Sequence, residues 1–322
     1  MRKALELKDY LSGLKKKDRT ILSRAITLVE SHNPGHQKLA QELLKSILPL
    51  TGLSKRIGIS GTPGVGKSTF IESFGKLLTS QNKTVAVLAV DPTSQVSGGS
   101  ILGDKTRMNE LAIDPLAFIR PSPSGETLGG VAKRTRESIL LCEAFGFDYV
   151  LVETVGVGQS ETTVAQMVDL FVMLLQPGSG DDLQGIKRGI LELVDLVVVT
   201  KDDGDNHVII EKAKHDYERA LHILRHEGWI PPVVSCSALT RKGLPEIQTL
   251  IEDYFVSQVK SIQSKRDHQG LNWMWQLVQE GLKESFLKKV SAAQIKEVEA
   301  RILSQTLTSP LAAEELLKKG LS

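Results

Sequence analysis

The chain carries at residues 56–69 the sequence Arg56-Ile-Gly-Ile-Ser-Gly-Thr-Pro-Gly-Val-Gly-Lys-Ser-Thr69, from which its architecture can be predicted. The apolar, β-branched run at residues 57–60 predicts a short buried strand, and the pattern of residues 68–79 predicts a helix. Between them lies a glycine-rich loop with the spacing G-x-x-x-x-G-K-S. A strand, such a loop and a helix in this order predict a phosphate-binding loop.

Each part of this loop has a physical role in holding a phosphate. Gly61 and Gly66 let the backbone curl so that successive N–H groups point inward, and the following helix adds the positive end of its dipole. Lys67 supplies a full positive charge to the outer phosphates, and the Ser68 hydroxyl is placed to bind Mg2+. We therefore expect a nucleoside triphosphate site formed by Gly61, Thr62, Pro63, Gly64, Val65, Gly66, Lys67, Ser68 and Thr69.

Short apolar runs alternate with helical stretches through the middle of the chain. Because the runs are apolar throughout, they predict a mostly parallel sheet with helices on both faces, and ligands at the carboxyl ends of its strands. We predict an α/β P-loop NTPase domain at residues 51–257, flanked by an N-terminal helical region at 1–50 and a C-terminal helical arm at 258–322. The predicted strands are residues 56–60, 84–90, 117–120, 149–153, 170–175, 196–200 and 232–237.

The composition is that of an ordinary globular protein. The 322 residues include 40 Lys and Arg against 38 Asp and Glu, and this balance gives no support for binding nucleic acid or an anionic membrane. The start of the chain lacks the apolar segment of a signal peptide, and no run approaches membrane-spanning length. The two cysteines, Cys142 and Cys236, are expected to be buried, reduced thiols. We expect a cytoplasmic location.

Two acidic residues follow apolar strands at the predicted ligand edge of the sheet. Asp91 comes after the strand at 84–90, and Glu153 ends the strand at 149–153. Carboxylates in such positions hold Mg2+ directly or through water. Either residue alone could equally be a capping residue, but together with Ser68 they favour a metal site.

Two glycine-rich segments have the composition of mobile switches. Gly156, just after Glu153, can offer its backbone N–H to a γ-phosphate and move when that phosphate leaves. The segment at residues 96–107 is the second. Its Asp104 is a candidate for the metal site, and Arg107 is a candidate for contact with the phosphates.

The identity of the base is predicted from Val198-Val-Thr-Lys-Asp-Asp203 and Ser235-Cys-Ser-Ala-Leu239. Asp203 is placed to accept both the N1–H and the 2-amino group of guanine, a donor pair that adenine lacks. The stem of Lys201 can cover the base. Thr200 stands where Asn is more usual and loses the amide's two-ended hydrogen bonding, which we expect to affect nucleotide affinity. Backbone N–H groups for guanine O6 are expected from the turn Ser237, Ala238 and Leu239.

Taken together, these residues resemble the MeaB/ArgK-type P-loop GTPases, chaperones of adenosylcobalamin-dependent methylmalonyl-CoA mutase. The resemblance covers essentially the whole chain, although the helical ends match by character more than by motif. Most of the matching sequence that is distinctive of the family lies outside the phosphate loop. The resemblance is therefore more specific than a generic GTPase motif. The segments are Ala89-Val-Asp-Pro-Thr-Ser94, Gly98-Gly-Ser-Ile-Leu-Gly-Asp-Lys-Thr-Arg-Met108, Glu153-Thr-Val-Gly-Val-Gly-Gln-Ser-Glu161 and Asp182-Leu-Gln-Gly-Ile-Lys187.

The resemblance implies several properties of the site and assembly. The segment from Gln184 to Lys187 is expected to be a further switch that communicates with the mutase. The C-terminal helices are expected to form a homodimer arm, which favours an interface for Trp273 and Trp275, although their apolar character alone fits a cover of the main domain equally well. Thr200, and Asp182 where Glu is common, depart from the family pattern. The implied Mg2+ positions are Ser68, Asp91, Asp104 and Glu153.

The expected activity is slow hydrolysis of GTP to GDP and phosphate. Lys67 and the loop amides would stabilise charge on the transferring phosphoryl group, and Gln159 and Arg107 are candidates for orienting water and for an arginine finger. Because the sequence has no obvious arginine finger, we predict a low intrinsic rate of GTP hydrolysis that the partner protein raises. The output would be gating of adenosylcobalamin loading, protection or release on the mutase. The sequence lacks a D-x-H-x-x-G pattern, so no cobalamin site of its own is predicted.

Three other functions are compatible with a P-loop protein. A nickel-insertion metallochaperone GTPase requires clustered Cys and His residues, whereas here the two cysteines stand alone and His222 and His226 have the spacing of an exposed helix face. A transport-associated ATPase or kinase requires ATP, against which Asp203 argues. A scaffold that binds GTP but never hydrolyses it would differ from a GTPase only in its rate of GTP hydrolysis.

Overall fold

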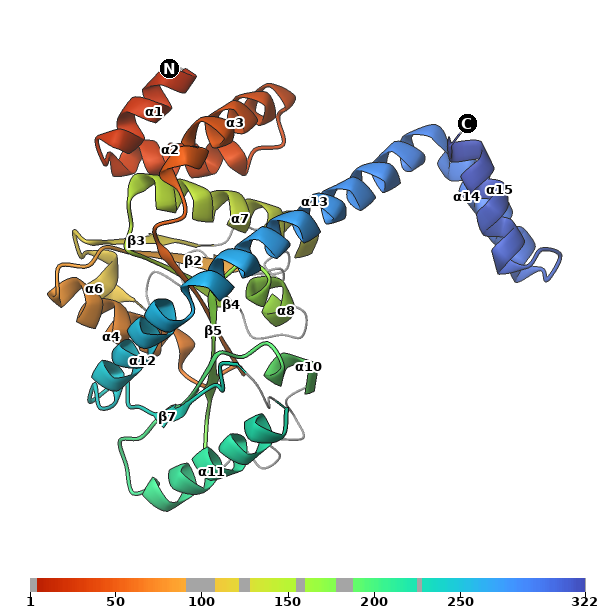
Figure 1. Cartoon of the computed structure of the whole chain (residues 1–322). Coiled ribbons are helices and arrows are strands. Elements are labelled where there is room, and N and C mark those ends of the chain that lie inside the picture. The colour runs from red at the N-terminus through yellow and green to blue at the C-terminus, as the bar shows by residue number, and fades with distance from the viewer. Residues whose placement is uncertain are drawn as a thin grey trace. The chain divides into compact units, whose positions relative to one another are not determined.

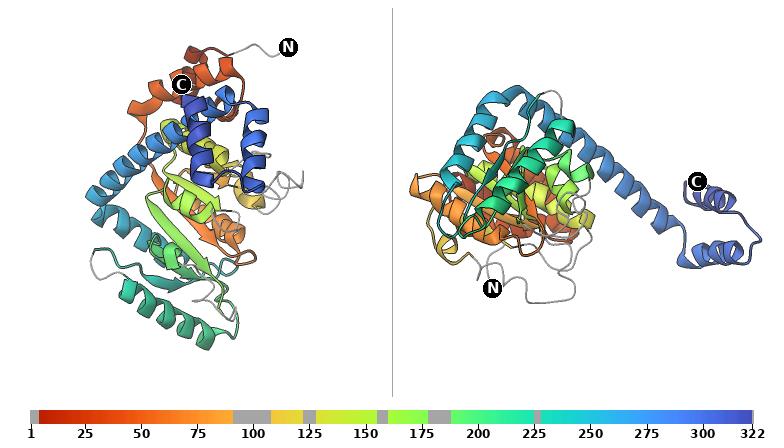
Figure 2. Two further views of the ribbon diagram at one scale, coloured as in Figure 1. Left: turned by 90° about the vertical axis from the view of Figure 1, so that its right-hand side faces the viewer. Right: turned by 90° about the horizontal axis from the view of Figure 1, so that it is seen from below.

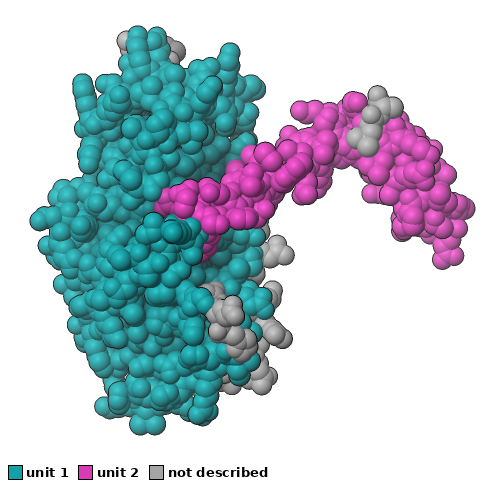
Figure 3. Space-filling model, in the orientation of Figure 1, with its two compact units in different colours: residues 1–262 teal, residues 263–322 magenta. Residues whose placement is uncertain are grey.

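The computed structural model describes residues 5–90, 108–121, 128–154, 160–177, 188–224 and 228–321. The chain divides into two compact units, residues 1–262 and residues 263–322, coloured separately in Figure 3. Within the described ranges, the first unit is an α/β domain that includes the N-terminal helices, and the second unit contains only helices and their connections.

Seven parallel strands in the described part of the first unit form one sheet (Figures 1 and 2). The strand order is β3-β2-β4-β1-β5-β6-β7, so the strand that leads into the phosphate loop, β1, lies between β4 and β5. The predicted parallel α/β sheet is therefore confirmed. The strands are β1 (Lys55–Gly61), β2 (Val85–Val90), β3 (Ala117–Arg120), β4 (Tyr149–Thr154), β5 (Leu170–Leu175), β6 (Leu196–Val199) and β7 (Val233–Ser235).

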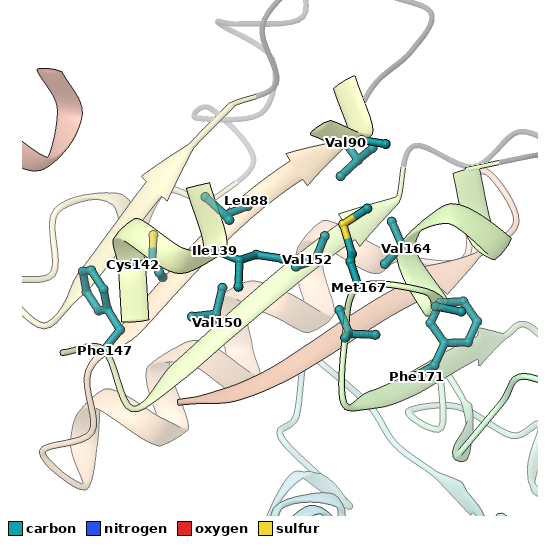
Figure 4. Packing of buried hydrophobic residues seen from close by; sticks show 14 of the residues in the cluster. Leu88, Val90, Ile139, Cys142, Phe147, Val150, Val152, Val164, Met167 and Phe171 are labelled. Carbon is teal, nitrogen blue, oxygen red and sulfur yellow. The ribbon is translucent and has the colours of Figure 1, made fainter. Parts of the chain in front are cut away.

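The strand side chains alternate between two apolar clusters, one on each face of the sheet. In β2, Leu88 belongs to one cluster and its neighbour Val87 to the other. Figure 4 shows Leu88 and Val150 of the sheet beside Ile139 and Cys142 of helix α7. Helices α7 (Leu128–Phe145), α8 (Ser160–Ala165), α10 (Arg188–Leu191) and α11 (His207–Leu224) contribute to this first cluster, and α4 (Lys67–Ser80), α6 (Asn109–Ala112) and α12 (Leu244–Ser257) to the second.

Gly58 allows helix α8 to lie close to β1 next to the phosphate loop. A Cβ atom at Gly58 would lie 2.9 Å from Val164 Cγ1 and 2.9 Å from Phe171 Cδ2, which is closer than real Cβ contacts. Even one extra methyl group in a close-packed interior forces neighbouring atoms to shift. The glycine at this position therefore allows Val164 of α8 to pack directly against β1.

The N-terminal helices α1 (Leu7–Lys15), α2 (Arg19–Val29) and α3 (Pro34–Ile47) share the apolar cluster of α7. The Asp18 side chain caps α2, and the Asn33 side chain caps α3 by accepting hydrogen bonds from the backbone N–H groups of Gly35 and His36. The sequence Asn33-Pro34-Gly35 predicts a break between two N-terminal helices, and α2 and α3 are indeed separate. However, Pro34 and Gly35 lie in the first turn of α3, because proline is favoured there. A short helical turn, η1 (Leu48–Leu50), follows α3.

An ion pair joins α7 to the start of β1 inside the first unit. Arg56 donates from Nε and Nη2 to the two carboxylate oxygens of Glu143, with both distances 2.7 Å. The Glu143 side chain is fully buried and also accepts a hydrogen bond from the Gly52 N–H. Because the pair is bidentate and largely buried, removing either partner would leave an uncompensated charge in the interior.

The second unit consists of most of α13 (Val259–Lys289), which begins in the first unit, and of α14 (Ala292–Leu303) and α15 (Ser309–Leu321). Ser291 and Gln294 form a capping box at the start of α14. Arg301 of α14 pairs with Glu315 of α15 at 2.9 Å. Gly320 lies so close to Phe286 that a Cβ atom there would meet the ring at 2.1 Å, so α15 rests directly on α13.

The cysteines are both buried and free, as predicted. Burial raises the pKa of Cys236 to about 12 and also raises the pKa of Cys142. At neutral pH both are therefore protonated thiols, the unreactive form.

None of the helices in the described ranges has both the length and the apolar content needed to cross a membrane.

Candidate nucleotide-binding site

The phosphate loop runs from the carboxyl end of β1 to the start of α4, at the centre of the sheet. Gly61 ends the strand, and a Cβ atom on it would lie 2.5 Å from the Leu174 carbonyl oxygen of the neighbouring strand β5. Gly66, just before α4, has φ +97°, a left-handed conformation that only glycine adopts freely. One glycine is therefore required by space and the other by backbone conformation. The intervening loop residues are Thr62, Pro63, Gly64 and Val65, and Thr69 lies in the first turn of α4.

Lys67 folds back over the loop. Its Nζ atom donates hydrogen bonds to the carbonyl oxygens of Gly61, at 2.7 Å, and Thr62, at 3.2 Å. The pKa of Lys67 is lowered, because burial disfavours its charged form more than the nearby carboxylates of Glu153 and Glu161 favour it. The amine is thus held at the mouth of the loop, where a phosphate contact is expected.

Ser68 and Glu153 meet beside the loop. The Ser68 hydroxyl donates to Glu153 Oε1 at 2.9 Å, and Glu153 is buried at the carboxyl end of β4. Behind them Thr154 donates to the Ser60 hydroxyl at 2.9 Å, which ties the ends of β4 and β1 together. A hydroxyl and a carboxylate oxygen are the hard ligands that Mg2+ prefers, so these two residues fit the predicted metal site.

A second acid near the loop was not assigned a role from the sequence. Glu161, in the first turn of α8, is buried, and its Oε2 atom has no hydrogen-bond partner in the part of the chain that the structure describes. Its charge acts on Lys67. Glu161 is therefore a second buried carboxylate whose charge reaches the lysine of the phosphate loop.

Thr200 links the end of β6, next to the residues predicted to bind the base, to the phosphate loop. Its hydroxyl lies 2.9 Å from the Val65 carbonyl and 3.1 Å from the Leu175 carbonyl, so it bridges the end of β6 to the loop and to β5. A hydroxyl carries one hydrogen for these two acceptors, whereas an amide carries two. The Thr200 hydroxyl therefore contacts the loop, but its single hydrogen is shared between the carbonyl oxygens of Val65 and Leu175.

We expect Thr200→Val to weaken GDP binding about fivefold to tenfold, because the Val65 carbonyl loses a buried hydrogen bond. Thr200→Ser keeps the hydroxyl and should bind GDP almost as the native protein does. Isothermal titration of the three proteins with GDP measures the difference. Equal affinities for all three would show that the bridge does not support the loop.

The two consecutive aspartates after β6 have different surroundings. Asp202 is buried and pairs with Lys242 at 2.9 Å and with the Ser235 hydroxyl at 2.8 Å. Asp203 is exposed and accepts a hydrogen bond of 2.7 Å from the Ser237 hydroxyl. Asp202 therefore holds the strand ends together, and Asp203 is the carboxylate accessible to a base.

Lys201, between Thr200 and the aspartates, has φ +64°. A left-handed backbone is uncommon at a residue with a Cβ atom and marks positions that the surrounding structure constrains. Its Nζ atom donates to Gln176 Oε1 at 2.7 Å, a contact that the sequence did not indicate. Gln176 follows β5, so the contact anchors the end of the lysine stem across the carboxyl edge of the sheet.

Other predicted site residues lie outside the described residues. They are Asp91, Asp104, Arg107, Gly156, Gln159, Gln184 and Lys187. The predicted site residues that the structure does describe lie along the carboxyl edge of the sheet. They are the phosphate loop, Glu153, Lys201, Asp203 and the turn at Ser237, Ala238 and Leu239.

A parallel sheet with this loop at its central strand defines a P-loop nucleotide-binding protein. The model of the family "Methylmalonyl Co-A mutase-associated GTPase MeaB" matches residues 22–291. The chain belongs to this family of GTPases, which confirms the resemblance predicted from its motifs.

Individual relatives and a solved structure agree with this placement. The chain is 53% identical to "GTPase ArgK" of Escherichia coli, over 83% of this chain and 82% of the relative. It is 49% identical to "Methylmalonic aciduria type A homolog, mitochondrial" of Mus musculus, over 95% of this chain and 78% of the relative. A crystal structure described as "LAO/AO transport system kinase" matches with a TM-score of 0.80 and 41% identity, covering 99% of this chain and 98% of that chain.

Proposed function

We propose that this protein is a slow GTPase that gates the loading, protection or release of adenosylcobalamin on methylmalonyl-CoA mutase. Membership of the MeaB family supports the mutase as client, because the family is described as mutase-associated. The observation that carries the guanine assignment is the contact between Asp203 and Ser237, which places an accessible carboxylate next to the turn expected to read O6. Thr200 connects this base region to the phosphate loop through the Val65 carbonyl.

The residues at the loop can perform the phosphoryl chemistry expected of a GTPase. Lys67 and the N–H groups at the start of α4 would bind the β- and γ-phosphates and stabilise the charge that develops on them during transfer. Ser68 and Glu153 would hold Mg2+, with Asp91 and Asp104 as further proposed ligands. When bound, Mg2+ would neutralise charge on the phosphate oxygens. Gln159 and Arg107 are proposed to orient the attacking water and to stabilise the transition state.

The output of the cycle would be a change in affinity for the mutase. We propose that Gly156 and the segment from Gln184 to Lys187 respond to the γ-phosphate and convey its presence to the partner. Completion of such a site by a partner can raise the rate of hydrolysis by about 10³–10⁵. The intrinsic rate would be low, so hydrolysis would follow docking on the mutase.

The client is tested by mixing the purified protein with an adenosylcobalamin-dependent methylmalonyl-CoA mutase. Sedimentation velocity is measured with GDP and with a non-hydrolysable GTP analogue. We expect a complex whose affinity differs by about tenfold or more between the two nucleotides, since allosteric coupling typically has that size. Loading and release of adenosylcobalamin, followed by absorbance, should then depend on the same nucleotide. No complex with either nucleotide would remove the mutase as client and favour the metallochaperone.

We also propose that the C-terminal helices pair with a second copy of the chain. One face of α13 carries exposed apolar side chains at helical spacing, and Trp275 is 61% exposed. Large apolar side chains concentrated on one helix face mark interaction sites, and Trp is favoured at their centres. The face consists of Leu271, Met274, Trp275, Val278 and Leu282.

Trp275→Glu is therefore expected to raise the dimer dissociation constant by about thirtyfold or more, because central tryptophans contribute about 2 kcal/mol or more. Gln276→Glu adds the same charge at the neighbouring exposed position and should leave the dimer intact. Sedimentation equilibrium of both variants measures the constants. If Trp275→Glu dimerises as the native protein does, or if the native protein is a monomer, this face of α13 is not the interface.

A further inference from the structure

The turn expected to read guanine O6 is tied to the phosphate-binding helix by one side chain. Ser73, in α4, donates a hydrogen bond of 2.7 Å to the carbonyl oxygen of Ala238. The two residues are 165 positions apart, and nothing in the sequence motifs connects them. The helix that begins at Lys67 in the phosphate loop thus reaches the turn expected to bind the base less than two helical turns later.

The bond to Ala238 fixes the direction of a backbone donor. The Ala238 carbonyl and the Leu239 N–H belong to one planar trans peptide, so they point in opposite directions. A carbonyl held toward Ser73 therefore holds the Leu239 N–H away from α4. Rotation of this peptide would break the hydrogen bond, which makes the orientation of the donor depend on the Ser73 hydroxyl.

The rest of the turn is held from its other side. The Ser237 hydroxyl accepts a hydrogen bond from the Thr240 N–H at 3.1 Å and donates to Asp203 at 2.7 Å. The N–H groups of Ala238 and Leu239 have no acceptor within the described ranges of the chain. Among the residues that the structure describes, the turn therefore presents two donors without an acceptor beside the carboxylate of Asp203. A carbonyl oxygen next to two N–H donors, which is the arrangement of O6, N1 and the 2-amino group in guanine, complements this set.

We propose that Ser73 is a positioning residue for recognition of the guanine O6 atom. It acts by holding the Ala238–Leu239 peptide in the orientation that binds this oxygen. The inference rests on the proposed guanine site and adds a residue on the phosphate helix to it. One helix then supports both ends of the nucleotide, with Lys67 and Ser68 at the phosphates and Ser73 behind the base.

The test compares nucleotides that differ in one recognition atom. GDP has all of them, 6-thio-GDP replaces O6 by the weaker acceptor sulfur, and IDP lacks only the 2-amino group. We expect Ser73→Ala to weaken GDP and IDP by the same factor, about threefold to tenfold, because both use O6. In Ser73→Ala, the ratio of the affinity for GDP to that for 6-thio-GDP should fall from its native value toward one. Ser73→Thr keeps the hydroxyl and should restore that preference.

A matched control is Ser80→Ala on the same helix. The Ser80 hydroxyl donates to the Leu77 carbonyl of its own helix, so its removal should leave all three affinities unchanged. A loss of affinity in Ser73→Ala that is equal for GDP and 6-thio-GDP would overturn the inference, since general loosening of the fold would have that result. If the native protein does not prefer GDP over ADP, the guanine site itself is wrong and the inference falls with it. The native protein could prefer GDP over ADP while Ser73→Ala leaves the ratio of affinities for GDP and 6-thio-GDP unchanged. That result would contradict the role of Ser73 and leave the guanine site intact.

Discussion

Replacing Lys67 by methionine is expected to lower kcat/KM for GTP hydrolysis by about a thousandfold. The lysine is the positive side chain that folds over the loop, and its Nζ atom lies 2.7 Å from the Gly61 carbonyl. Methionine keeps much of the length and apolar surface of the stem but removes the charge. A charge that acts on the transition state lowers kcat as well as affinity when it is lost.

The control for this variant is Lys212→Met on α11, an exposed lysine away from the loop. It makes the same chemical change and should leave hydrolysis unchanged. Phosphate release under multiple turnover measures both proteins, and thermal unfolding checks that each is folded. A folded Lys67→Met protein with more than about a tenth of native kcat/KM would contradict the role given to the loop.

The second large effect is expected from Asp203→Asn, which should exchange the base preference. Asp203 is the accessible carboxylate, and it would accept the N1–H and 2-amino hydrogens of guanine. The amide NH2 group of Asn would face the 2-amino group of guanine, so two hydrogen-bond donors would meet with no acceptor between them. GTP should therefore bind about 10³-fold more weakly. Xanthine carries a carbonyl at that position, which accepts from the Asn amide, so XTP should bind better than GTP.

The measurement is competition among GTP, XTP and ATP for binding to the native and Asp203→Asn proteins. Asp202 is not a suitable site for the exchange, because its carboxylate is buried and pairs with Lys242. Unchanged guanine selectivity in Asp203→Asn would remove this residue as the base reader. A native preference for ATP would instead favour a transport-associated kinase.

The sheet and the phosphate loop could be predicted because their determinants are local. Apolar runs such as 170–175 are strands buried on both faces, and the glycines at 61 and 66 are required by close packing and backbone conformation. The start of α3 is less evident from local sequence. Its Pro34 and Gly35 resemble a break, yet the Asn33 side chain turns them into the first turn of a helix.

Contacts between distant segments could not be predicted in the same way. Glu161 is recognisable as a buried acid near Lys67 only once α8 is placed against β1. The contact of Lys201 with Gln176 joins residues 25 positions apart, and that of Ser73 with Ala238 joins residues 165 apart. Such partners depend on which strand ends become neighbours, and a motif read along one segment does not contain that information.

The central claim is tested most directly by the rate of GTP hydrolysis with and without an adenosylcobalamin-dependent methylmalonyl-CoA mutase. We predict a slow basal rate that the mutase raises by at least about tenfold, an increase that Lys67→Met abolishes. A basal rate that the mutase leaves unchanged, with no complex formed, would contradict the proposed function while leaving the nucleotide site intact.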